Sequence, residues 1–169
     1  DEIDLQLNRI FVNVHFLRIN QIDKAIKGFE EIVNETIYPW NLLVAGMGGI
    51  IIGGIAEQEK LVIDGIDKMK EFIKVKKWES LSNFTKIGEV YIYLFNEKCN
   101  EAIKKAEEVI STHSYWLKVL SPVILKSYNK QNDFLNTIKV GQKYLNKSEN
   151  KPLILLEIAK AHLGLDEND

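Results

Sequence analysis

The segment Gln21-Ile22-Asp23-Lys24-Ala25-Ile26 returns in altered form three more times along the chain. Each copy ends on a small residue followed by isoleucine, and the later copies are Leu61-Val62-Ile63-Asp64-Gly65-Ile66, Lys98-Cys99-Asn100-Glu101-Ala102-Ile103 and Asp133-Phe134-Leu135-Asn136-Thr137-Ile138. The small residues are 40 positions apart from Ala25 to Gly65, 37 from Gly65 to Ala102 and 35 from Ala102 to Thr137. A near-constant period of this size predicts an array of helix pairs, because one pair cannot bury its own apolar face and must pack on its neighbours.

The spacing of apolar residues predicts helices along nearly the whole chain, and no segment alternates apolar and polar residues for long enough to form a strand. No linker-like composition divides residues 1–169, so the sequence predicts an all-α fold in a single helical-repeat domain. The expected helix pairs are 4–17 with 22–34, 41–58 with 61–76, 79–96 with 99–112, and 115–130 with 133–146, followed by a ninth helix at 153–165.

Prolines and glycines mark the exceptions to this pattern. Pro39 and Pro152 fall at or just before helix starts, where a missing N–H has little effect. Pro122 either kinks its helix or moves the helix start past Ser121. The five glycines between Leu42 and Ala56 weaken a helix, so they are expected to let a neighbouring helix approach closely, and a bare backbone would also admit a ligand or partner; they are Gly46, Gly48, Gly49, Gly53 and Gly54.

The residues at set positions in each pair resemble the tetratricopeptide repeat family, whose unit is a 34-residue helix pair. The matching residues are Val12, Phe16, Ala25 and Phe29 in the first unit, Ile52, Gly53, Ala56, Gly65 and Met69 in the second, Tyr93, Ala102 and Ala106 in the third, and Ile124, Tyr128, Thr137 and Gly141 in the fourth. This resemblance implies a right-handed α-solenoid of about four antiparallel helix pairs plus a terminal helix. Other helical repeats of similar length and a non-repeating helical bundle remain alternatives.

In tetratricopeptide repeats the first helices of successive pairs line a concave groove, and the resemblance therefore implies which residues bind a partner. The implied groove is almost wholly apolar, and only Lys126 and Asn129 are similar to the residues with which some modules of this family hold a terminal carboxylate. An apolar or amphipathic partner is the expectation. The implied binding residues are Leu7, Ile10, Val14, Met47, Ile50, Gly54, Phe84, Ile87, Tyr91 and Lys126.

Several classes of function are not expected from the composition and motifs. The formal charge of −2 is spread over interspersed acids and bases, so a nucleic-acid partner is not expected. The apolar run from Leu42 to Ala56 is 15 residues long, short of the roughly 20 that span a bilayer. No catalytic, phosphate-loop or metal-spacing motif occurs, and His15, His113 and His162 lie in different helical units. The sequence therefore predicts neither an enzyme nor a metal or cofactor site, and Cys99 is expected to pack inward.

These observations predict a non-enzymatic module that binds a protein or peptide partner, with self-association as one form of it. The alternative is an accessory protein of a transport or sensing system that binds a hydrophobic small molecule. Residues 153–163 are apolar on nearly every side, so we expect either that the chain continues or that a second subunit covers this helix. The sequence favours the cytoplasm, and export of a processed chain is the alternative because the sequence begins at Asp1.

Overall fold

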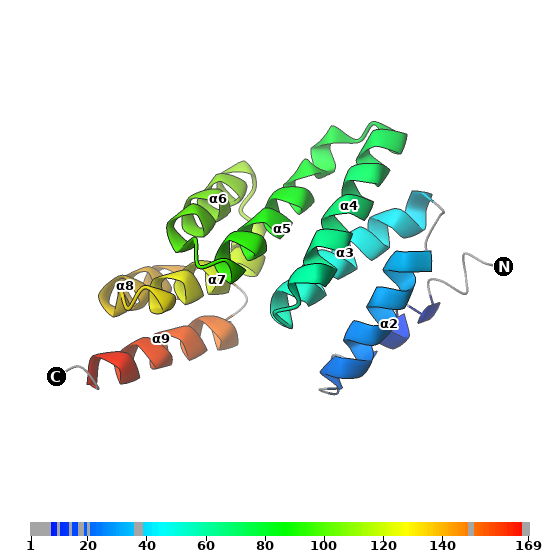
Figure 1. The fold of residues 1–169 in the computed structure, drawn as a ribbon. Coiled ribbons are helices and arrows are strands. Elements are labelled where there is room, and N and C mark those ends of the chain that lie inside the picture. The colour runs from blue at the N-terminus through cyan, green and yellow to red at the C-terminus, as the bar shows by residue number, and fades with distance from the viewer. Residues whose placement is uncertain are drawn as a thin grey trace. The chain divides into compact units, whose positions relative to one another are not determined.

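The computed structural model describes residues 8–9, 11–13, 15–16, 19, 21–35, 39–148 and 151–166, with side chains for all of these except 33–35 and 39–41. Every regular element within these residues is a helix, which confirms the all-α fold class for the part of the chain described (Figure 1). Residues 8–9, 11–13 and 15–16 are also helical. The bounds are α2 Ile22–Glu35, α3 Pro39–Ile55, α4 Glu59–Lys76, the 3-10 helix η1 Glu79–Leu81, α5 Ser82–Phe95, α6 Cys99–Thr112, α7 Trp116–Lys130, α8 Phe134–Leu145 and α9 Lys151–Asp166.

The chain divides into two compact units, residues 1–88 and 89–169, and the division falls within α5. The first unit contains α2, α3, α4 and the start of α5. The second contains the rest of α5 and helices α6 to α9. The organisation as one domain and the right-handed solenoid remain predictions, and each unit is described by itself below.

Hairpin turns of one kind recur within the described residues and give the repeat a physical basis. In each, the N–H of the residue before a helix donates to a carbonyl five residues earlier, which closes the preceding helix end. The donor and acceptor residues are Gln21 and Phe16, Gln58 and Gly53, Lys98 and Tyr93, and Asp133 and Tyr128, at 2.8, 2.8, 2.9 and 3.0 Å. These four donors are 37, 40 and 35 positions apart, which is close to the spacing of the sequence repeat, and Trp78 makes the same bond to Ile73 at 3.3 Å between α4 and η1.

The second copy of the sequence repeat is shifted by one helical turn relative to its predicted alignment. The N–H groups of Ala25, Ala102 and Thr137 bond the carbonyl of the turn residue four positions earlier, and in the second copy Val62 makes this bond to Gln58. Val62 and not Gly65 is therefore the equivalent of Ala25. The alignment on small residues was wrong here because the close contact at Val62 is made possible by Gly53 of α3, whereas one turn further along the glycine has to be on α4, at Gly65.

The core of the first unit lies where α3 and α4 meet backbone to backbone. A Cβ atom at Gly49 would lie 3.0 Å from Cα of Gly65, and one at Gly53 would lie 2.9 Å from the backbone nitrogen of Val62. This packing explains why α3 contains glycines that weaken an isolated helix, as the sequence predicted. The ring of Phe29 on α2 lies against Gly48 and joins a cluster of buried side chains.

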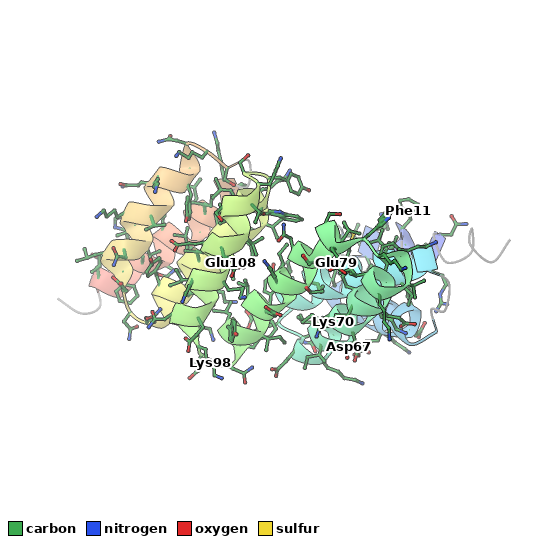
Figure 2. The ribbon with its side chains drawn as sticks, turned by 90° about the horizontal axis from the view of Figure 1, so that it is seen from above. Phe11, Asp67, Lys70, Glu79, Lys98 and Glu108 are labelled. Atoms are coloured by element: carbon green, nitrogen blue, oxygen red, sulfur yellow. The ribbon has the colours of Figure 1, made fainter. Side chains whose placement is uncertain are left out.

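The opposite side of α4 faces solvent. Asp67 and Lys70 are exposed there (Figure 2), whereas Ile66 and Met69 are buried. This alternation has the 3.6-residue period of a helix with one buried face, so α4 is covered on one side within its unit.

In the second unit α7 packs against α6, α8 and α9, and α8 packs against α9. A cluster of buried side chains from α7 and α9, Leu125, Ile154 and Ile158, lies at the centre of these contacts. Helix α7 begins at Trp116 and continues through Pro122. The alternative that Ser121 caps a later helix start is therefore wrong. Ser121 lies within α7, and its side chain is buried.

Candidate interaction surface

The structure distributes the groove residues implied by the family resemblance between the two units. Leu7, Ile10 and Val14 lie outside the described residues. The remaining residues are Met47, Ile50 and Gly54 on α3 and Phe84 and Ile87 on α5 in the first unit, and Tyr91 on α5 and Lys126 on α7 in the second.

These residues differ in how much surface they offer to a partner. Ile50 and Ile87 have no exposed surface, and Tyr91 is 4% exposed. Cγ1 of Ile50 lies 3.4 Å from the position that a Cβ would take at Gly88, so Ile50 fills space between helices. Met47, Phe84 and Lys126 are half-buried and retain surface that a partner could contact. A substitution at Ile50 or Ile87 would therefore act on folding, and the groove itself stays a prediction.

The burial of Tyr91 makes the stability of the folded chain depend on pH in the alkaline range. Burial raises the pKa of Tyr91 to about 12, whereas a tyrosine in an unfolded chain has a pKa of about 10. The folded state therefore holds this proton more tightly, and its contribution to stability is complete below pH 10 and is lost as the pH rises towards 12. We expect Tyr91→Phe to remove about 1.4 kcal/mol of alkaline destabilisation at pH 11, halfway between the two pKa values. Urea unfolding at pH 8 and pH 11 measures the free energy of unfolding of the wild type and of Tyr91→Phe. If both proteins lost the same stability between the two pH values, the prediction would be contradicted.

Helix α9 is fixed in its unit by one apolar face and by one buried carboxylate, that of Glu157. Ile154, Ile158 and Ala161 are buried on this face. The side chain of Asn129 on α7 donates to both the backbone carbonyl and Oε2 of Glu157, each at 2.9 Å. Lys160 Nζ lies 2.7 Å from Glu157 Oε1. Since a buried carboxylate is costly without partners, the two hydrogen bonds from Asn129 on α7 set the rotation of α9 about its own axis.

The rotation of α9 leaves an apolar stripe on its outer side. Leu155, Ala159 and Leu163 follow each other at intervals of four residues, opposite the buried face, and Leu156 lies beside them. Leu155 is 52% exposed, Leu156 48% and Leu163 64%. Helix α9 packs against α7 and α8 through its inner side (Figure 1). We call these four residues the α9 stripe. The sequence predicted an apolar terminal helix but not which of its faces is free.

The described residues contain few groups suited to chemistry. No group of three His, Cys, Asp or Glu side chains among them could hold a metal ion. Cys99 is buried in the first turn of α6, as expected, and burial raises the pKa of its thiol, which disfavours the reactive thiolate. Within the same residues, no helix combines the length and apolar character needed to cross a bilayer.

Comparison of the chain with protein-family models, curated proteins and solved structures returned no match. The resemblance to tetratricopeptide repeats therefore stays a prediction from the residue pattern.

Proposed function

We propose that the chain is a non-enzymatic interaction module of the tetratricopeptide type, a right-handed solenoid of helix pairs, and that it binds an apolar or amphipathic helix. The observation on which this rests is the α9 stripe. Single exposed leucines are common on soluble proteins, but a row of them on one helix face usually marks a contact surface. The spacing of Leu155, Ala159 and Leu163 matches the pattern by which one helix packs along another.

The size of the α9 stripe sets the expected strength of binding. One face of a 16-residue helix is smaller than the roughly 800 Å² per partner of a standard stable interface. Burying apolar surface contributes about 25 cal/mol per Å², much of which offsets the entropy lost on association. We therefore expect reversible association, with a dissociation constant of about a micromolar or weaker.

The same helix in a second copy of the chain is the partner that fits this stripe best. If two copies of α9 cross antiparallel with Ala159 on the two-fold axis, Leu155 of each lies opposite Leu163 of the other. The small Ala159 side chain lets the two backbones approach closely. Lys151 at one end of the helix then lies near Asp166 at the other end of its counterpart, which gives complementary charge at both ends.

A cysteine at the axis tests this arrangement. In a Cys99→Ala background, which removes the one native thiol, Ala159→Cys should form an intermolecular disulfide under mild oxidation because the two Cβ atoms meet at the axis. Non-reducing gel electrophoresis measures the cross-linked fraction.

Gln142→Cys, at an exposed position of α8, is the matched control and should remain monomeric. Equal cross-linking at positions 142 and 159 would mean random collision and would refute the antiparallel pairing. An absence of cross-linking at 159 would refute it as well.

A further inference from the structure

A polar pocket in the second unit lies apart from the α9 stripe. It has a volume of about 330 Å³ and forms where the turn between α6 and α7 meets the residues after α8. Its described lining consists of His113, Ser114, Tyr115, Lys118, Lys147 and Ser148. The lining therefore contains two lysines and several neutral hydrogen-bonding groups, and none of these described residues is acidic. Such a lining favours an anion.

The backbone around the pocket fixes the orientation of the histidine. Nδ1 of His113 accepts a hydrogen bond of 3.1 Å from the backbone N–H of Tyr115. An imidazole nitrogen that accepts a hydrogen bond has no proton, so the proton of the neutral ring is on Nε2. His113 can therefore donate a hydrogen bond from Nε2 even without a positive charge.

The remaining donors are supplied by two segments that are distant in sequence. Lys118 lies in the first turn of α7, while Lys147 and Ser148 follow α8 and are held by backbone bonds to the Tyr144 carbonyl at 2.9 and 2.8 Å. Ser148 is 5% exposed, so one polar residue of the lining is largely buried. Lys118 and Ser148 also contact other groups of the chain, and a ligand would join those contacts.

We propose that this pocket binds the phosphate group of a small soluble phosphomonoester. The lining residues carry two ammonium groups, an imidazole N–H and three hydroxyls, which are more donors than the two oxygens of a carboxylate can accept. A phosphomonoester presents three terminal oxygens and a charge of about −1.5 to −2 near neutral pH, and it matches both the donors and the charge. The volume exceeds that of the phosphate alone and leaves room for a small organic substituent. This site is independent of the proposed interaction module.

Titration followed by ¹⁵N-¹H correlation spectra tests the proposal. O-phosphoserine and inorganic phosphate should shift the amide signals of Ser114, Tyr115 and Ser148 in a saturable way, and acetate at equal ionic strength should not. Lys118→Ala combined with Lys147→Ala should weaken phosphate binding by about a hundredfold, or about tenfold for each lost charge-assisted contact.

The matched control is Lys139→Ala combined with Lys143→Ala, which removes the same charge from exposed positions of α8 and should leave the affinity unchanged. Linear shifts without saturation, equal binding of acetate, or an equal loss of affinity in the control pair would overturn the proposal. Binding to vesicles that contain phosphatidic acid without binding to O-phosphoserine would also overturn it, because the ligand would then be a membrane headgroup.

Discussion

Gly65→Ala should lower the free energy of unfolding of the first unit by about 2 kcal/mol, although the same exchange on an exposed helix raises stability by up to about 1 kcal/mol. The sign reverses because of where the added Cβ would lie. It would be 2.7 Å from the backbone nitrogen of Ile50 and 2.9 Å from the backbone oxygen of Gly46. Backbone atoms cannot rotate away as a side chain can, so α3 and α4 would have to separate and lose packing along their length.

Urea-induced unfolding followed by circular dichroism measures this change, and Gly164→Ala on α9 is the matched control. A Cβ at Gly164 would meet the ring of Phe134, a half-buried side chain that can rotate aside. The control should therefore cost clearly less than Gly65→Ala, because a side chain and not the backbone of a neighbouring helix has to shift. If Gly65→Ala were as stable as the wild type, the close backbone contact between α3 and α4 would be wrong.

The sequence specified the helices well and the contacts between them less well. Helix α6 has the predicted bounds of 99–112, and α4 ends at Lys76 as predicted, because apolar period and turn residues are local properties of the chain. Gly65 shows the limit of this approach. Its small side chain suggested equivalence with Ala25, but the close contact that requires glycine depends on α3, and the register of one helix on another is not encoded locally.

The candidate sites were harder to predict for the same reason. The family resemblance implies that Ile50 lines a groove, yet Ile50 has no exposed surface in the structure. The sequence predicts no binding site at His113, since its neighbours in the sequence form no motif. Its pocket also contains Lys147 and Ser148 from after α8, and only the fold of the second unit brings these segments together.

Replacing Leu155 and Leu163 with glutamate should abolish self-association and leave the fold intact. Both side chains are more than half exposed at 52% and 64%, so the charges are solvated in the monomer and do not disturb the core. In the proposed antiparallel pair they would be buried against each other without partners, at a cost of several kcal/mol. We expect the dissociation constant to rise by about a hundredfold or more.

The matched control is Leu135→Glu on α8, which adds the same charge in place of a leucine that is 72% exposed and lies outside the α9 stripe. It should associate as the wild type does. Circular dichroism should show the same helix content in the wild type, in Leu135→Glu and in the double variant, because every substituted side chain faces solvent.

Analytical ultracentrifugation over a wide range of concentrations tests the central claim most directly. The account predicts that the sedimentation coefficient of the wild type and of Leu135→Glu rises with concentration from monomer towards dimer, while Leu155→Glu with Leu163→Glu stays monomeric throughout. A wild-type chain that sediments as a monomer at every concentration, or a double variant that dimerises as well as the wild type, would contradict the assignment of the α9 stripe as the interaction surface.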